Sequence, residues 1–556
     1  MSMIIRKTII FRSRMRLRSG RLLFPAKVFY LIRKAMNRYK PFQFTAILIL
    51  VLFSVNSFAR AATQDDHLFR YKDYNIVLVY IDTLRADHLG CYGYSRNTLP
   101  NIDKLASEAI IFTNNFTPVT YTLASFMSII TSLYPKSHGV LEAYKDKIPS
   151  GVKTLPQILR FYGYKTAWFG PNHDAHLDPR VGFGLGFDEI KLSNYSRYNP
   201  AAQGRLLCAW LEANKDSRFF LNFHTYKPHD PYFPSLSYRE RFSKRKQPTI
   251  PVTGEELGRA IFEDAQKAIA GKEPWFTEIV GQGLLDKIIA MRIFEGGFAP
   301  WKLSSLRAFF AKNDRELIMA QLESYVYWSS INLEDPEVKK YVVALYDAAI
   351  LEFDSAVIGP LVAKLKQLGL YDKTVIVICS DHGEEFFEHS GHGHGPTLYE
   401  EVTRVPLIIK TPWIKRGRKI DALSQTTDIM PTLLDLLGMV IPAQAQGKSL
   451  AGLINNTEFL PPHKYVFGQR MDKSSIRSGK WSLILNDEEP GELYQINLDP
   501  RQQHNLYSEK KKVSAKLTRE LNGWESSLKR YQDKECAFPD KIDVKTREKI
   551  RKTGYW

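Results

Sequence analysis

Three residues of the sequence, Asp82, Asp381 and His382, have side chains suited to hold a divalent cation. Manganese and zinc accept carboxylate oxygen together with imidazole nitrogen, and calcium and magnesium accept the oxygens. A single aspartate after a strand is more often a cap or a turn residue. An adjacent Asp-His pair that is followed by a glycine and two acids, with another aspartate after a second apolar run, instead indicates a metal site.

Apolar runs precede each of these residues. "NIVLVYI" leads to Asp82, "FFLNF" leads to His224 and His229, and "VIVIC" leads to Asp381. Continuous apolar runs are typical of parallel strands that are buried on both faces, and ligands gather at the carboxyl ends of such strands. We therefore expect these polar side chains to meet at one edge of a sheet.

The elements between these runs predict the fold class. Residues 341–370 have apolar positions at helical spacing and end at Gly369, a plausible C-terminal stop. Strands that alternate with helices predict an α/β sandwich around a mainly parallel sheet. Helical patterns at about 238–337 predict an insertion, and short strands from about residue 465 predict a small antiparallel subdomain. The expected catalytic domain is 75–460, and the C-terminal subdomain and tail are 461–556.

The first 62 residues read as a targeting segment. Of the net charge of +18, 13 positive charges lie between Arg6 and Arg60, where there is no acid, so the remainder carries only +5. This balance gives no reason to expect a nucleic-acid partner. The apolar run from Phe44 to Val55 has signal-peptide length, and a start at Met36 would give a signal peptide of ordinary length. The alternative is an uncleaved membrane anchor. A linker, 63–74, follows, and we expect a periplasmic or secreted catalytic body, or one anchored to the outer face of the membrane.

Several stretches resemble the signatures of the sulfatase family in the alkaline phosphatase superfamily. They are "VYIDTLRADHLGCYGY", "SLYPKSHGV", "VICSDHGEEFFEHSGHGHGPTLYEEVTRVPLII", "TTDIMPTLLDLLG" and "ELYQINLDP", in the order of the family. The resemblance implies an alkaline-phosphatase-like fold and one active-site metal ion, with Asp82, Asp381 and His382 among its ligands. The family's nucleophile segment aligns with this chain through the stretch "TSLYP". This alignment assigns Thr122 to the nucleophile position.

The sequence departs from a typical sulfatase at this position. Family members carry Cys or Ser followed by x-Pro-Ser-Arg, and a dedicated enzyme converts the Cys or Ser to formylglycine. This chain reads "TLASF", with Thr122, Ala124 and Phe126 in place of the Cys, Pro and Arg. A second metal carboxylate of the family is replaced by Thr83, and a lysine of the family by Pro171. These changes argue against an ordinary arylsulfatase.

The remaining pattern is similar to that of lipoteichoic-acid synthases and phosphoethanolamine transferases, which use threonine directly. The resemblance implies that Thr122 is both a metal ligand and a nucleophile, with manganese or zinc favoured and calcium or magnesium as alternatives. A phosphate ester is favoured over a sulfate ester, because a sulfated threonine lacks the second hydroxyl through which formylglycine expels sulfate. An unorthodox sulfatase and a non-catalytic binding protein stay as alternatives.

Further residues are expected to contact an anionic ester, which could belong to a saccharide, a lipid head group or a small molecule. Histidine suits proton transfer to a leaving group near neutral pH. The expected catalytic histidines are His224, His229 and His394, and the expected substrate-binding residues are Lys227, His392 and His173.

Overall fold

The structure is a computed structural model. It describes residues 73–141, 146–171, 184–193, 199–243, 327–328, 331–457, 460–470, 472–487 and 490–531. The expected signal peptide, most of the expected helical insertion and His173 lie outside these described residues. Among the described residues there is no helix that is long and apolar enough to cross a membrane.

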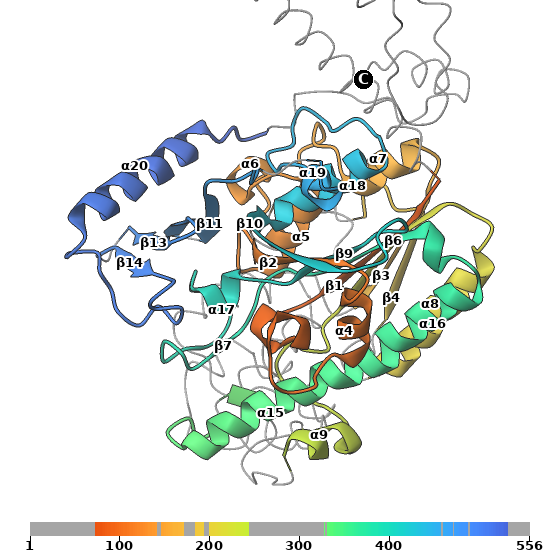
Figure 1. Ribbon diagram of the computed structural model, residues 1–556, viewed down its shortest axis with the longest axis horizontal. Coiled ribbons are helices and arrows are strands. Elements are labelled where there is room, and N and C mark those ends of the chain that lie inside the picture. The colour runs from red at the N-terminus through yellow and green to blue at the C-terminus, as the bar shows by residue number, and fades with distance from the viewer. Residues whose placement is uncertain are drawn as a thin grey trace, which may run out of the picture. The chain divides into compact units, whose positions relative to one another are not determined.

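An eight-stranded sheet forms the centre of the described fold (Figure 1). Seven of its strands run in one direction, and β9 is antiparallel to both of its neighbours, β6 and β2. In spatial order the strands are β10 (Arg418–Gln425), β2 (Ile110–Phe116), β9 (Leu407–Lys410), β6 (Thr374–Ser380), β1 (Asn75–Ile81), β5 (Phe219–Thr225), β3 (Lys165–Pro171) and β4 (Glu189–Ser193).

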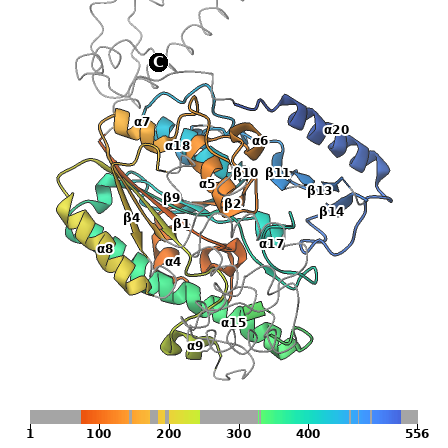
Figure 2. The same ribbon diagram turned by 180° about the vertical axis from the view of Figure 1, so that it is seen from behind.

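Helices cover both faces of this sheet (Figures 1 and 2). Strand side chains alternate between the faces, so that Val77 and Val79 of β1 belong to one apolar core and Ile76 and Leu78 to the other. The first core contains α4 (Pro100–Ala106), α8 (Pro200–Ala213), α15 (Pro336–Phe353) and α16 (Gly359–Gln367). The second contains α5 (Thr122–Thr131), α7 (Leu155–Phe161), α18 (Ile429–Leu436) and α19 (Ala451–Ile454).

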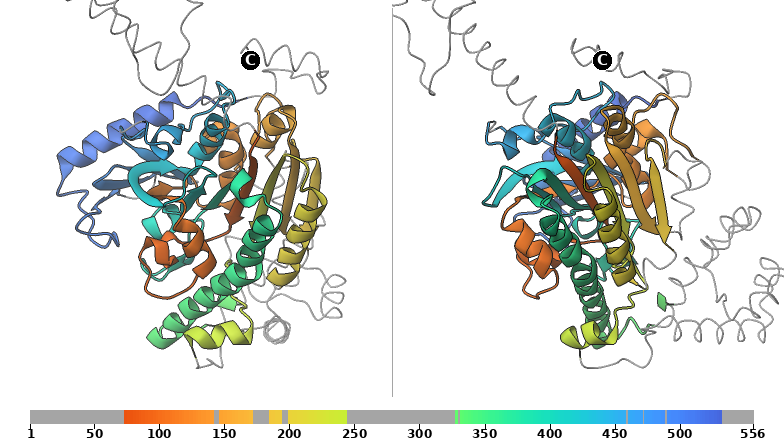
Figure 3. Two further views of the ribbon diagram at one scale, coloured as in Figure 1. Left: turned by 45° about the vertical axis from the view of Figure 1, so that its right-hand side comes forward. Right: turned by 90° about the vertical axis from the view of Figure 1, so that its right-hand side faces the viewer.

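The predicted helix at 341–370 is one long helical rod (Figure 3). It consists of α15, a π-helical turn at Asp354–Ile358 and α16. Gly369 follows with a φ of 67°, a left-handed conformation in which glycine has no steric penalty, and its N–H donates to the carbonyl of Lys366. The rod thus ends at the predicted glycine.

A second, antiparallel sheet follows the main sheet in sequence. Its order is β11 (Val466–Arg470), β12 (Lys473–Arg477), β13 (Trp481–Asn486) and β14 (Glu492–Gln495). Leu517 and Leu521 of α20 (Lys511–Ser527) pack on this sheet. The predicted fold class, a mainly parallel sandwich with a small antiparallel sheet, is confirmed. The smaller elements are α6 (Pro135–His138), α9 (Leu236–Phe242), α17 (Glu400–Thr403), β7 (Glu385–Phe386) and β8 (His392–Gly393).

Candidate active site

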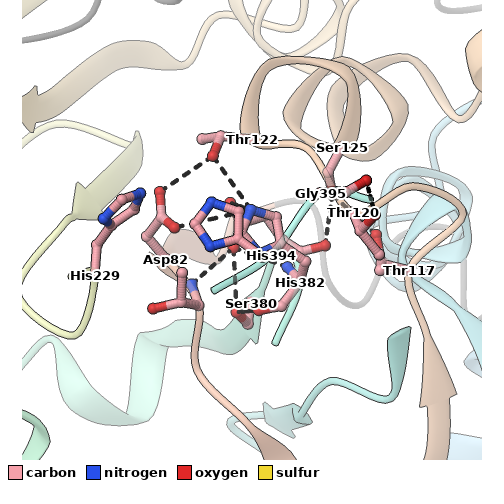
Figure 4. Close-up of polar contacts among 12 residues, drawn as sticks. Asp82, Thr117, Thr120, Thr122, Ser125, His229, Ser380, His382, His394 and Gly395 are labelled. Atoms are coloured by element: carbon pink, nitrogen blue, oxygen red, sulfur yellow. Dashed lines mark hydrogen bonds and ion pairs between the residues drawn. The ribbon is translucent and has the colours of Figure 1, made fainter. Parts of the chain in front are cut away.

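Neighbouring parallel strands bring Asp82 and Asp381 together. Ile81 of β1 pairs with Ser380 of β6, so that the two aspartates leave the sheet side by side. Ligand atoms of Asp82, Asp381 and His382 all lie within 4.8 Å of one another, and the three side chains are fully buried. The structure therefore brings the three predicted metal ligands into one group, called the ligand cluster below; Figure 4 labels Asp82 and His382 of this cluster.

The protonation states in this cluster suit a cation. Burial opposes the ionisation of Asp381, but His382 and His224 hold its pKa below the ordinary value. Burial lowers the pKa of His382 to about 3, against the attraction of Asp381. Nδ1 of His382 lies 3.0 Å from the carbonyl oxygen of Gly383, which can only accept a hydrogen bond. Nδ1 therefore carries the proton, and the lone pair of Nε2 is available to a metal.

Hydrogen bonds also fix the orientation of the Asp381 carboxylate in the ligand cluster. Its Oδ1 accepts bonds from the backbone N–H groups of Thr83, at 3.1 Å, and His382, at 2.8 Å. Its Oδ2 is buried and lies 3.2 Å from Nε2 of His382. Buried carboxylates are costly unless positive charge compensates them. Two carboxylates and a neutral imidazole whose ligand atoms converge fit one divalent cation.

Thr122 lies against the cluster (Figure 4). It is the first residue of α5, and its Oγ1 lies 3.4 Å from Oδ2 of Asp82 and 3.3 Å from Nε2 of His382. The N-terminus of a helix favours negative charge, including that of an alkoxide. Two contacts fix the helix here: Tyr80 donates to the carbonyl of Thr122, and Ser125 donates to the carbonyl of Asp381.

Thr83 occupies a strained position beside the cluster. Its φ is 54°, which is rare for a β-branched residue, and its buried Oγ1 makes no hydrogen bond in the described part of the chain. Tyr346 of α15 holds the conformation by donating to the carbonyl of Thr83, 2.9 Å away. Such strain persists only where the surroundings impose it, and it is common at functional sites.

His224 is part of the buried site. Its Nε2 lies 3.4 Å from Oδ2 of Asp82, and its ring packs against Tyr80, with the ring centroids 4.3 Å apart. Burial lowers its pKa to about 3, although Asp381 opposes this shift. The neutral ring suits a role in orienting Asp82 or in holding the metal. Its predicted contact with the ester stays a prediction.

His229 and His394 form a pair next to the cluster. Their ring centroids are 4.8 Å apart, and the ring of His394 stacks on that of His382 at 4.2 Å. Nδ1 of His229 lies 2.6 Å from the backbone carbonyl oxygen of Asp230 and 2.7 Å from its Oδ1, and Nδ1 of His394 lies 3.0 Å from Oε1 of Glu384. A carboxyl group thus contacts the same nitrogen of each ring, and in His229 the backbone carbonyl of Asp230 contacts it as well.

Sequence reasoning missed both of these carboxyl groups. Asp230 directly follows His229, and Glu384 is the second residue after His382, so each stands beside a residue that was predicted. Glu384 is fully buried, and burial raises its pKa well above the ordinary value. Short polar neighbours of catalytic histidines are the signal that could have identified them.

Two of the predicted substrate-binding residues have other contacts. Lys227 is buried, and its Nζ lies 2.8 Å from Oε2 of Glu352 on α15 and donates to the carbonyl of Phe233. These contacts engage the amine of Lys227 inside the fold, and its predicted contact with substrate stays a prediction. His392 is exposed, and its ring stacks on Trp328 with the centroids 4.2 Å apart. His173 lies outside the described residues.

Comparison with known proteins agrees with the fold and the motifs. The Sulfatase family profile matches residues 74–439, and a profile described as N-sulphoglucosamine sulphohydrolase, C-terminal, matches residues 391–527. The chain is 25% identical to an N-acetylglucosamine-6-O-sulfatase of Bacteroides thetaiotaomicron, over 88% of this chain and 91% of that protein. It is 24% identical to the multifunctional alkaline phosphatase superfamily protein PehA of Trinickia caryophylli, over 68% of this chain and 76% of that protein.

Solved structures share the fold. One is a phosphonate monoester hydrolase of Agrobacterium radiobacter, with a TM-score of 0.60 and 19% identity, which covers 82% of this chain and 96% of that one. Another was solved in complex with its substrate D-glucosamine-2-N,6-O-disulfate, with a TM-score of 0.61 and 22% identity, over 82% of this chain and 98% of that one. The family profile spans well over half of the chain. The protein therefore belongs to the sulfatase family of the alkaline phosphatase superfamily and is a sulfatase-like ester hydrolase.

Proposed function

We propose that the protein cleaves a phosphate ester through a covalent intermediate on Thr122, with one divalent metal ion, and passes the phosphoryl group to water or to an acceptor hydroxyl. The observation that carries this proposal is the position of Oγ1 of Thr122, 3.4 Å from Oδ2 of Asp82 and 3.3 Å from Nε2 of His382. A hydroxyl at that point can be a ligand and a nucleophile at once.

Asp82, Asp381, His382 and Thr122 would hold the metal. It would supply Lewis-acid stabilisation of the charge on the ester and would favour the ionised form of the threonine hydroxyl. The imidazole among the ligands favours manganese or zinc over calcium and magnesium.

Residues of the protein accept and supply the protons that this reaction transfers. Oγ1 of Thr122 attacks phosphorus and gives up its proton to one of the paired histidines, His229 and His394. The bond to the leaving oxygen breaks, and the other histidine protonates that oxygen. In the second step water or an acceptor hydroxyl attacks phosphorus and gives its proton to the histidine that protonated the leaving oxygen, and Oγ1 leaves with the proton held by the other histidine. Burial lowers the pKa of His394 to about 3, so its ring begins neutral and has a free lone pair to accept a proton.

Phosphorus is favoured by the chemistry of threonine. A phosphothreonine can be opened by in-line attack of water or an alcohol on phosphorus, whereas the sulfated residue of a sulfatase is opened by elimination from a geminal diol, which threonine cannot form. A phosphonate monoester hydrolase and PehA are among the relatives and fold neighbours.

The second candidate is a sulfatase that acts on a sulfated saccharide, because a relative matched over 88% of this chain is an N-acetylglucosamine-6-O-sulfatase.

We also propose an extracytoplasmic location, since the first 62 residues combine basic residues with an apolar run of signal-peptide length.

An anionic saccharide is the substrate class favoured by the names of the relatives.

The test is the ratio of turnover on matched esters. The full chain, loaded with manganese or zinc, would be assayed on 4-nitrophenyl phosphate, bis(4-nitrophenyl) phosphate and 4-nitrophenyl sulfate. We expect phosphate ester cleavage that Thr122→Ala abolishes and that Thr457→Ala, at an exposed threonine, leaves intact. Cleavage of only the sulfate ester would favour the second candidate. Turnover that survives Thr122→Ala would overturn the threonine mechanism.

A further inference from the structure

Arg470 connects the C-terminal subdomain to the active site. It is the last residue of β11, and the preceding residue, Gln469, donates its backbone N–H to the carbonyl of Pro118 at 2.8 Å. Pro118 belongs to the loop that leads into Thr122. The backbone of β11 therefore fixes the base of the Arg470 side chain against the nucleophile loop.

The guanidinium group of Arg470 contacts both segments that carry reactive residues. Its Nε donates to the carbonyl of Gly395, the residue after His394, at 2.7 Å. Its Cζ lies 4.9 Å from the ring centroid of Tyr121, the residue before Thr122. A single cation thus joins the nucleophile segment to the segment of His394, and its charge contributes to lowering the pKa of His394.

Two other cations, one of them the predicted Lys227, form ion pairs with carboxylates of the fold. Lys227 is paired with Glu352, and Arg85 is paired with Asp87 and Glu388. Position 126, where the family has an arginine, is a fully buried Phe126 in an apolar core. Arginine keeps its charge at all physiological pH values and offers a fork of donors to an anion.

We propose that Arg470 is a specificity-determining residue that binds a second anionic group of the substrate, a carboxylate, sulfate or phosphate outside the ester that is cleaved. The reacting ester must lie at Oγ1 of Thr122 among fully buried side chains. Arg470 is half-buried and contacts the residues that flank this point, so it meets the part of the substrate that extends out of the cluster.

This inference rests on the proposed function, and its test separates the two. Binding would be measured by calorimetry on Thr122→Ala protein loaded with manganese, where no covalent step can follow. The probes are phenyl phosphate and 4-carboxyphenyl phosphate, which differ only in the carboxylate group. We expect the parent to prefer the carboxylated ester by about tenfold, as a charge-assisted hydrogen bond allows.

Substitutions at position 470 decide the outcome. Arg470→Gln should abolish the preference by weakening the carboxylated ester more than phenyl phosphate, and Arg470→Lys should keep part of it. Lys480→Ala, which removes an exposed charge in the same subdomain, is the matched control and should keep all of it. Equal affinities in the parent, no binding of either ester, or equal weakening of both esters in Arg470→Gln would overturn the inference. Failure of the proposed function would appear separately, as wild-type protein without phosphate ester turnover.

Discussion

The ligand cluster and the surrounding residues, His229, His394 and Arg470, differ in how the fold holds them. Asp82 and Asp381 follow paired strands, and the sheet register sets their separation. The surrounding residues come from a loop after β5, a loop after β8 and the C-terminal subdomain. Rigid strand ends are suited to chemistry that tolerates little displacement, whereas loops are suited to recognition of variable substrates. The difference predicts larger losses for changes in the cluster than for changes around it.

Loss of a cluster ligand should have the largest effect. Asp381→Asn removes one of two buried carboxylates, and we expect metal content below one ion per chain and a fall in kcat/KM of about 10³-fold or more. Elemental analysis and kinetics would check both. Chelation of wild-type protein should give the same loss, and manganese or zinc should restore it. A variant with full metal content and full activity would contradict the assignment of the cluster.

The carboxyl groups that hold the two histidines should have a smaller effect. Glu384→Gln keeps a hydrogen-bond partner for Nδ1 of His394, while Glu384→Ala removes it. We expect kcat to fall by about 10- to 100-fold in the alanine variant and by less in the glutamine variant, with little change in KM. Equal losses in both variants, or a change confined to KM, would argue against a positioning role.

Lys227 provides a contrast to the ligand cluster, because it follows β5 close to His229 but its amine bonds to Glu352 and Phe233. Removal of one partner from a buried ion pair is costly, so Lys227→Met should lower the free energy of unfolding by about 3–5 kcal/mol. Denaturant unfolding would measure this loss, and the double variant Lys227→Met/Glu352→Leu should recover most of it. The turnover of folded Lys227→Met protein should stay within about twofold of wild type, because the amine of Lys227 is bonded to Glu352 and to the carbonyl of Phe233. A large loss of turnover with unchanged stability would restore its role on substrate.

The smallest predicted effect concerns the loop that carries His389. Burial opposes protonation, but Glu401 raises the pKa of His389 to about 9. Nδ1 lies 2.6 Å from Glu401, and Nε2 lies 3.1 Å from the carbonyl oxygen of Gln502, so both nitrogens face acceptors.

A raised pKa in the folded state stabilises the fold at low pH. The stabilisation from His389 should be complete below the unfolded pKa of about 6.5 and should fade as the pH rises through about 9. The difference in Tm between wild type and His389→Gln should therefore be larger at pH 6 than at pH 10. A difference that is constant with pH would contradict the charged pair.

The difference between residues at strand ends and residues on loops also explains how much of the fold and of the site can be predicted from the sequence. The apolar runs before Asp82 and Asp381 place both residues at one edge of a parallel sheet, because parallel strands share the direction of their ends. The antiparallel insertion of β9 and the contacts of Lys227 do not follow from such a pattern. Arg470 lies far along the chain from Thr122, and only the docking of β11 on the nucleophile loop brings it close.

The most direct test of the central claim is the intact mass of the full chain, loaded with manganese or zinc, after rapid acid quenching during turnover of 4-nitrophenyl phosphate. The covalent mechanism predicts a mass increase of one phosphoryl group, mapped by peptide fragmentation to Thr122 and absent from Thr122→Ala. Turnover in the quenched sample without an adduct, or an adduct on another residue, would contradict the claim that Thr122 is the nucleophile.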